Sequence, residues 1–301
     1  MIIEQRALWG DEPTAEHPAT YTAYLAAKMP DSSCGLRPAV VICGGGGFTH
    51  IAPHEQEPVA LEFLARGYQA FVLDYVTSST GDVSYPNPQA DLAKMIATVR
   101  LNAGEWGVDP ERVVAVGFSA GGFICASLAT DWRGGPFAAL AGCRPEDARP
   151  DAVVLGYPVI DFAYLRDQQT RDPRIDLRVP KTGGKTGRDL LNEFLAMVTG
   201  GEATDEHLAQ ICPTNKVSRG MPPTFVWCAA DDKTAPAAQV YPFACRMAEE
   251  GVVHEMHVFG EGGHGLSVAN RRTECDNADR QAAVRPWLDL AFAFLVRVGI
   301  Q

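Results

Sequence analysis

Short apolar runs alternate along the chain with longer stretches in which apolar residues recur at helical spacing. The apolar runs predict strands over 20–27, 38–43, 68–76, 112–117, 151–157, 223–230 and 252–259. The helical spacing predicts helices over 55–66, 89–106, 120–130, 237–250 and 281–298. Because strands that alternate with helices form parallel sheets covered on both faces, we expect an α/β fold with a doubly wound, mostly parallel sheet.

One polar segment, residues 162–221, interrupts this alternation. It contains one amphipathic stretch, at 189–198, and otherwise lacks the apolar runs of the predicted strands. We expect a single domain over residues 1–301, in which this segment is a small cap over the carboxyl ends of the strands, where ligands bind in such sheets. A surface excursion with no part in specificity is the alternative.

The composition fits such a domain and narrows the choice of partner. The 301 residues are 46% hydrophobic and 21% charged, which is ample for one large core. The net charge of −11 would repel phosphate backbones. We therefore expect a neutral or weakly charged small-molecule substrate and no nucleic acid.

Targeting and redox signals are absent from the sequence pattern. The first residues lack a basic flank followed by an apolar run, and no stretch approaches the roughly 18 apolar residues of a membrane helix. The eight cysteines are scattered without a C-x-x-C pair, which favours reduced thiols. We expect a cytoplasmic protein that is a monomer or homodimer and has no membrane partner.

The segment Gly117-Phe118-Ser119-Ala120-Gly121 has the G-x-S-x-G pattern of a nucleophile elbow. A nucleophilic serine must sit on a tight turn, and the residues two positions away on either side must be very small. A predicted strand precedes the motif and a predicted helix follows it, as this turn requires. Ser119 is therefore the predicted nucleophile, with an ordinary glycine-rich turn as the alternative.

A general base and an acid are expected after the serine, in the order Ser, Asp or Glu, His. His264 is the predicted base because it lies in a glycine-rich loop between the last strand and the last helix. Asp231 and Asp232 follow the strand at 223–230, where an acid would orient the imidazole. We favour Asp232, with Asp231 as a loop or capping residue; helix capping before Pro236 is the alternative for both.

Four glycines, 44–47, follow the strand at 38–43. Glycine lets backbone N–H groups approach a developing oxyanion closely. We expect an oxyanion hole made by Gly46, Gly47 and Ala120, the residue after the nucleophile. A phosphate-binding loop would need a following Lys and Ser or Thr, or G-x-G-x-x-G spacing, and neither is present.

Two further patterns are weaker. The stretch 182–187 is similar to a P-loop but has no preceding strand and the wrong spacing. His50 and His54 have the spacing of helical metal ligands, but Pro53 breaks the helix that such a pair uses. We expect no metal and no cofactor.

Several segments carry a family resemblance: Cys43–Phe48, Glu55–Ala60, Arg66–Leu73, Gly117–Gly122, Tyr157–Ile160, Pro222–Trp227, Asp232 with Pro236, and His257–Leu266. Together they resemble the esterase/lipase branch of the α/β-hydrolase superfamily, in particular its acetyl-xylan-esterase-like and feruloyl-esterase-like (BD-FAE) members. Gly44 is a departure, since many relatives have Pro or His before the glycine triplet. This departure leaves the N–H donors in place.

The resemblance implies hydrolysis of short acyl esters, often acetyl groups on sugars. We therefore expect a serine carboxylesterase that acts through an acyl-enzyme on a small-molecule ester, with acetylated carbohydrate among the candidates. A serine peptidase or amidase of the same fold and a non-catalytic binding protein are the alternatives. The segment 162–221 matches no substrate pattern.

Overall fold

The computed structural model describes residues 1–27, 35–171, 184–273 and 278–300. Its eight strands form one sheet in the order β1-β2-β4-β3-β5-β6-β7-β8. Strands β3 to β8 are parallel, whereas β2 is antiparallel to both β1 and β4. The strands are β1 (Ile2–Ala7), β2 (Thr20–Leu25), β3 (Arg37–Cys43), β4 (Gln69–Asp74), β5 (Val108–Phe118), β6 (Ala152–Gly156), β7 (Thr224–Ala229) and β8 (His254–Phe259). This sheet confirms the predicted α/β class.

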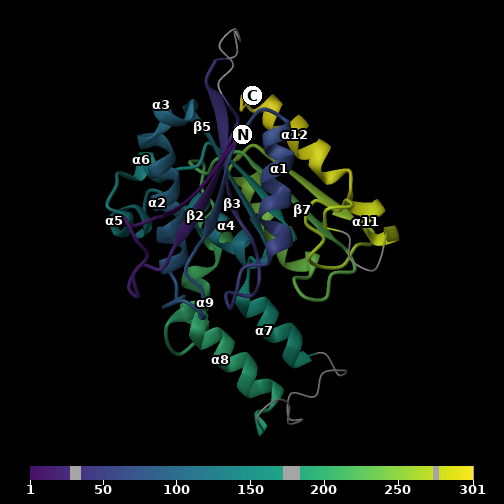
Figure 1. The fold of residues 1–301 in the computed structure, drawn as a ribbon. Helices are drawn as coiled ribbons and strands as arrows, with labels where there is room; N and C mark the ends of the chain where they lie inside the picture. Colours follow the sequence, from purple (N-terminus) through teal and green to yellow (C-terminus); the bar gives the residue numbers. More distant parts are fainter. Residues whose placement is uncertain (28–34, 172–183, 274–277, 301) are drawn as a thin grey trace.

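Helices cover both faces of the sheet (Figure 1). Those before β6 are α1 (Glu57–Ala65), α2 (Asn87–Leu101), α3 (Ala103–Trp106), α4 (Ser119–Asp131), α5 (Phe137–Ala141) and α6 (Pro145–Ala148). Those after β7 are α10 (Val240–Glu249), α11 (Ala278–Val284) and α12 (Trp287–Arg297). Helices α1 and α12 share one face, where the rings of Phe63 and Phe292 lie 4.7 Å apart. Helix α2 packs against α4, α5 and α6 on the other.

Strand β1 was not among the predicted elements. It pairs only with β2, so it is an edge strand, and Ile2 and Ile3 are 50% and 54% exposed. An edge strand that faces solvent needs no buried apolar run, and the remainder of β1 is mostly polar. The apolar pattern that located the central strands is therefore missing here.

Two predicted helices are each interrupted once. The helix expected at 89–106 divides at Asn102, whose side chain donates a hydrogen bond to the Thr98 carbonyl (2.8 Å). The helix expected at 281–298 divides before α12 because Pro286 lacks an N–H group and cannot continue the preceding turn. The pattern of apolar residues continues across both breaks, which explains the prediction of single helices.

Residues 162–221, called the insertion below, leave the sheet after β6 and return before β7. Their described part contains α7 (Phe162–Arg171), α8 (Gly187–Thr199), α9 (Asp205–Ile211) and the 3-10 turn η3 (Pro213–Lys216); residues 172–183, and with them the start of the P-loop-like stretch, lie outside the described residues. Helices α7 and α8 project beyond the end of the sheet (Figure 1). The N–H of Tyr85 donates to the Val198 carbonyl (2.8 Å), which ties α8 to the body.

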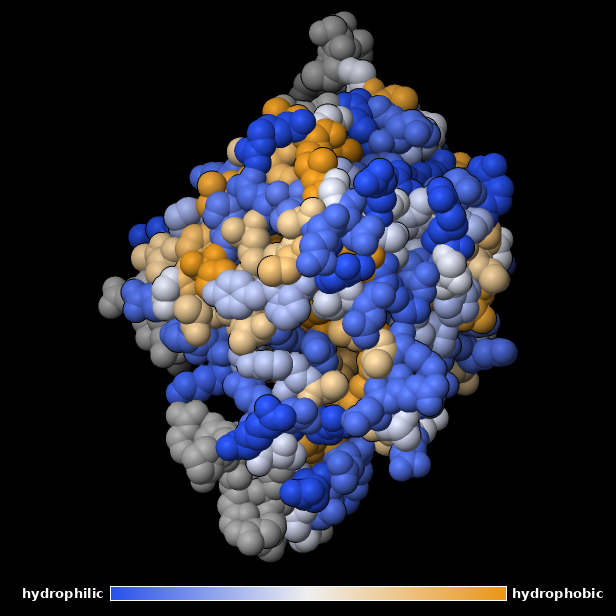
Figure 2. All heavy atoms as spheres, turned by 180° about the vertical axis from the view of Figure 1, so that it is seen from behind, coloured by the Kyte–Doolittle hydropathy of each residue, from blue (hydrophilic) through white to orange (hydrophobic). Residues whose placement is uncertain are grey.

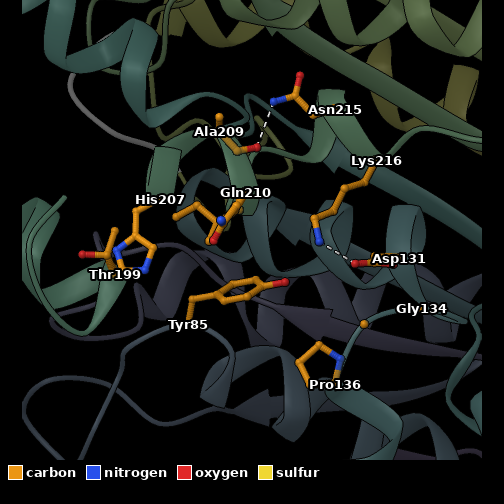
Figure 3. Close-up of a pocket in the computed structure, with 12 residues that line it drawn as sticks. Tyr85, Asp131, Gly134, Pro136, Thr199, His207, Ala209, Gln210, Asn215 and Lys216 are labelled. Atoms are coloured by element: carbon orange, nitrogen blue, oxygen red, sulfur yellow. Dashed lines mark hydrogen bonds and ion pairs between the residues drawn. The ribbon is translucent and has the colours of Figure 1, made fainter. Parts of the chain in front are cut away.

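A cavity of about 560 Å³ lies at the seam between the insertion and the body. Tyr85 lines it from the body, and His207 and Gln210 line it from α9 (Figure 3). The ion pair between Asp131, at the end of α4, and Lys216, on η3, joins the two parts with an N–O distance of 2.5 Å. None of the predicted site residues lines this cavity, so it belongs to the seam rather than to the predicted active site.

The surface turned away in Figure 1 is covered mainly by hydrophilic residues, with smaller apolar areas between them (Figure 2). Within the described ranges, none of the helices has the length and apolar character needed to cross a bilayer.

Candidate active site

Ser119 lies at the sharp turn between β5 and α4, with a positive φ of 51°. The two flanking glycines are required by close backbone packing. A Cβ atom on Gly117 would lie 2.3 Å from the Gly121 carbonyl oxygen, and one on Gly121 would lie 2.1 Å from the Cys43 carbonyl oxygen. The sequence G-x-S-x-G thus lets α4 pass directly against the end of β3.

The structure brings Ser119, His264 and Asp232 together from distant parts of the chain. Asp232 follows β7, and His264 follows β8 on a loop before α11. The distance from His264 Nε2 to Ser119 Oγ is 2.9 Å, and that from His264 Nδ1 to Asp232 Oδ2 is 2.7 Å. Asp232 is buried, so its carboxylate meets the imidazole away from bulk water.

The neighbouring acids make different contacts. Asp232 uses its second oxygen, Oδ1, to accept hydrogen bonds from the N–H groups of Thr234 and Ala235 (2.8 and 2.9 Å). Asp231 accepts a hydrogen bond from the N–H of Gly263 (2.7 Å), the residue before His264. Asp232 therefore contacts the imidazole directly, whereas Asp231 holds the backbone of the histidine loop.

The glycine loop crosses directly over the nucleophile. A Cβ atom on Gly45 would lie 2.7 Å from Ser119 Cβ. Gly46 and Gly47 both have positive φ, 125° and 60°. Within the described chain, no residue accepts a hydrogen bond from the N–H of Gly46, Gly47 or Ala120. Ala120 is in the first turn of α4, where N–H groups have no partner within the helix.

Three polar residues near these groups were not identified from the sequence: Glu55, Tyr157 and Ser267. Glu55, on the 3-10 turn η1 (Pro53–Glu55), accepts hydrogen bonds from Gly45 N–H and from the Tyr157 hydroxyl, both at 2.6 Å. The Tyr157 hydroxyl accepts one from Ser267 N–H (2.8 Å). The position of Tyr157 at the carboxyl end of a predicted strand was the one available signal.

His50 and His54, which have the spacing of a helical metal pair, make separate contacts in the structure. His50 Nδ1 lies 3.0 Å from Thr49 Oγ1, and His54 Nε2 lies 3.7 Å from Glu55 Oε1. In the ranges that the structure describes, no group of three or more His, Cys, Asp or Glu side chains is arranged to hold a metal ion.

A serine at a strand-to-helix turn, followed by an acid and a histidine after later strands of a mostly parallel sheet, defines the α/β-hydrolase class. The chain belongs to the BD-FAE family, whose sequence model matches residues 25–247. This membership confirms the family resemblance noted in the sequence.

Solved structures with the same fold span nearly the whole chain. The carboxylesterase Cest-2923 from Lactobacillus plantarum WCFS1 is 28% identical, with a TM-score of 0.79 over 100% of this chain and 98% of that one. An acetyl ester-xyloside bifunctional hydrolase from Caldicellulosiruptor lactoaceticus is 26% identical, with a TM-score of 0.74 over 99% of this chain and 97% of that one.

Curated relatives are longer than the matched region. Endo-1,4-beta-xylanase B of Butyrivibrio fibrisolvens is 33% identical over 78% of this chain, and acetylxylan esterase of Xylanibacter ruminicola is 28% identical over 46% of it. The chain spans about a third of the first protein and about a quarter of the second (33% and 26%).

Proposed function

We propose that this protein is a serine carboxylesterase with Ser119 as nucleophile, His264 as general base and Asp232 as the acid that orients it. The observation that carries the proposal is the continuous chain of contacts from Asp232 through His264 to Ser119, at 2.7 and 2.9 Å. Both distances are within the hydrogen-bond reach that proton transfer from a nucleophile requires.

In the proposed reaction, His264 Nε2 accepts the Ser119 proton as Oγ attacks the ester carbonyl carbon. The imidazolium then gives this proton to the leaving alcohol as the ester bond breaks, which leaves an acyl-serine. In the second half of the reaction, His264 takes a proton from water as the water oxygen attacks the acyl carbon. The acyl–Oγ bond then breaks, the carboxylic acid leaves, and the proton returns to Oγ. The buried Asp232 carboxylate stabilises the transient imidazolium and fixes the tautomer with a proton on Nδ1.

The proposed oxyanion hole consists of the N–H groups of Gly46, Gly47 and Ala120. Support comes from the loop crossing over Ser119 and from the absence of competing acceptors among the described residues. The N-terminus of α4 adds the positive end of a helix dipole at the same place. Each such donor typically contributes 10²- to 10³-fold to the rate, as an order of magnitude.

We further propose a short acyl ester as substrate, with acetylated carbohydrate as the first class to test. Two relatives support this: one is named an acetylxylan esterase and the other an acetyl ester-xyloside hydrolase. The insertion is proposed to act as a cap on the acyl side, because the Phe194 ring of α8 lies 6.4 Å from that of Phe48, the residue after Gly47.

The decisive variant is Ser119→Ala. We expect it to reduce kcat on p-nitrophenyl acetate by about 10⁶-fold, because the reaction then has no nucleophile. A fluorophosphonate probe should label the wild-type protein at Ser119 and leave the variant unlabelled, while circular dichroism stays unchanged.

Full activity of the variant, or unlabelled wild-type protein, would reject the mechanism. A matched series of p-nitrophenyl acyl esters, acetylated xylo-oligosaccharides and peptide amides then fixes the substrate. Preference for amides would favour the peptidase alternative, and no turnover at all would favour a binding protein.

A further inference from the structure

Glu55 is a buried carboxylate outside the proposed triad. Its side chain is 3% exposed. Among the described residues, only His54 brings a chargeable nitrogen within 4 Å of it, at 3.7 Å. Burial of a carboxylate without a close cation is costly unless hydrogen bonds satisfy its oxygens. Each Glu55 oxygen accepts one short bond, Oε2 from Gly45 N–H and Oε1 from the Tyr157 hydroxyl.

Tyr157 extends this contact to the histidine loop. Its hydroxyl accepts the N–H of Ser267, three residues after His264. Its ring packs edge-on against the His264 imidazole, with centroids 4.9 Å apart. Burial and the Glu55 charge hold the pKa of the Tyr157 hydroxyl well above its usual value, so the hydroxyl stays protonated and donates a hydrogen bond to Glu55.

Ser267 closes the network into a ring. Its hydroxyl donates to the His54 carbonyl (2.6 Å), the residue before Glu55. The turn that carries Glu55 is therefore bonded to the histidine loop both through Tyr157 and through Ser267. Ser267 and Tyr157 both have positive φ, 49° and 35°, so their backbones are held in sparsely populated conformations within this ring.

The position of Gly45 links the ring to the oxyanion loop. Glu55 fixes the Gly45 peptide through its N–H, and Gly46 and Gly47 follow immediately. Because Gly46 and Gly47 follow directly in the chain, a shift of the Gly45 backbone would displace both of their N–H groups. Glu55 thus contacts the donor loop on one side and, through Tyr157, the loop of the base on the other.

We propose that Glu55 is a positioning residue that fixes the oxyanion loop and the His264 loop relative to each other, with Tyr157 as its link. This inference rests on the proposed esterase function. Because a displacement of about 1 Å in a catalytic group lowers rates by about 10²-fold, Glu55→Ala should lower kcat on p-nitrophenyl acetate by about 100-fold. Because the proposed role of Glu55 acts on groups that stabilise the transition state, KM should stay within about threefold.

Glu57→Ala is the matched control. Glu57 lies two residues away, is exposed, and also accepts a tyrosine hydrogen bond, from Tyr24 (3.2 Å), but among the described residues it makes no hydrogen bond to the glycine loop. Its loss should leave kcat and KM unchanged. Glu55→Gln is the second variant, because it keeps the shape but offers a single acceptor oxygen. It should lose at least about fivefold in kcat, on the same displacement argument.

Coupling between the two side chains completes the test. Tyr157→Phe should also lower kcat, and combining it with Glu55→Ala should cost much less than the product of the two single losses, since both break one ring. Wild-type kcat in Glu55→Ala, or in Glu55→Gln if the alanine variant does not fold, would overturn the proposal. An equal loss of kcat in Glu57→Ala would also overturn it, and so would purely additive losses in the double variant. If Ser119→Ala stays active, the proposed function fails instead, independently of Glu55.

Discussion

Ser119 has a positive φ, a backbone conformation that residues with a side chain rarely adopt, and other residues of the site share it. Four of the positive-φ non-glycine residues in the described chain lie at the site: Phe48, Ser119, Tyr157 and Ser267. Each such residue costs roughly 1–3 kcal/mol. They persist because surrounding contacts over-determine them, as the packing around Ser119 and the ring through Glu55 illustrate.

The two neighbouring acids should be separable by substitution. Asp232→Asn should lower kcat by about 10⁴-fold, because the amide favours the wrong imidazole tautomer. Asp231→Asn keeps an acceptor oxygen for the Gly263 N–H. It should lower kcat by no more than about tenfold, because a slightly looser histidine loop loses only a small part of the roughly 10²–10⁴-fold that a positioned acid–base group contributes. Steady-state kinetics with p-nitrophenyl acetate checks both variants. Equal losses would contradict the assignment of Asp232.

At the scale of elements, the insertion meets the body through aromatic rings. Phe48 on the glycine loop and Phe123, one turn into α4, have ring centroids 6.1 Å apart. Phe162 of α7 and Phe194 of α8 pack against this pair, Phe162 at 4.8 Å from Phe123 and Phe194 at 6.4 Å from Phe48. The insertion therefore rests on the two elements that carry the proposed oxyanion donors.

Removing one of these rings should widen the acyl side of the site. Phe194→Ala should raise the ratio of kcat/KM for p-nitrophenyl butyrate over acetate by about tenfold, since each methylene accommodated in an apolar pocket contributes about 1–3 kcal/mol. Leu190→Ala, one turn earlier on α8 and 36% exposed, is the control and should leave the ratio unchanged. An unchanged ratio in both variants would show that the insertion does not limit acyl length.

Much of this arrangement was accessible from the sequence because it is local. The central strands, the G-x-S-x-G turn and the glycine loop can each be recognised from a short stretch of sequence. The order of the residues along the chain then indicated His264 and Asp232. Glu55 is the first residue of the helix predicted at 55–66, whereas in the structure it ends the 3-10 turn η1 before α1 begins. Its partners lie 102 residues away at Tyr157 and 10 away at Gly45, and no local pattern encodes such pairings.

At the scale of the whole molecule, a buried carboxylate on α2 contacts the segment that joins β1 to β2 and makes stability depend on pH. Asp91, on α2, accepts hydrogen bonds from the Trp9 indole (2.7 Å) and from Val76 N–H (2.9 Å). Burial raises its pKa from 3.8 to about 6, although both hydrogen bonds oppose the rise. Ionised Asp91 is therefore a cost to the folded state that the unfolded chain does not bear.

The free energy of unfolding should fall as pH rises from about 4 to about 6. Between pH about 4 and 6 the folded chain binds more protons at Asp91 than the unfolded chain, so the free energy of unfolding decreases with pH, by up to about 3 kcal/mol in total. Asp91→Asn cannot titrate and should flatten the slope. Denaturant unfolding at pH 4 to 7 measures it, with exposed Asp11→Asn as the control that keeps the slope. A persistent slope in Asp91→Asn would assign the effect to other groups.

The insertion occupies one uninterrupted stretch of sequence, between β6 and β7, whereas the proposed catalytic groups follow β3, β5, β7 and β8. Under the proposed function, the segment that would limit the acyl group is thus contiguous in sequence, whereas the proposed catalytic groups lie on both sides of it. A recombinant chain with breakpoints near Asp161 and Met221 would carry a different insertion and keep the proposed catalytic groups. The new insertion would have to preserve the main contacts with the body, among them the Asp131–Lys216 ion pair and the packing against the Phe48 ring. Under the proposed function, exchange of the insertion would therefore alter the substrate range without altering the proposed catalytic groups.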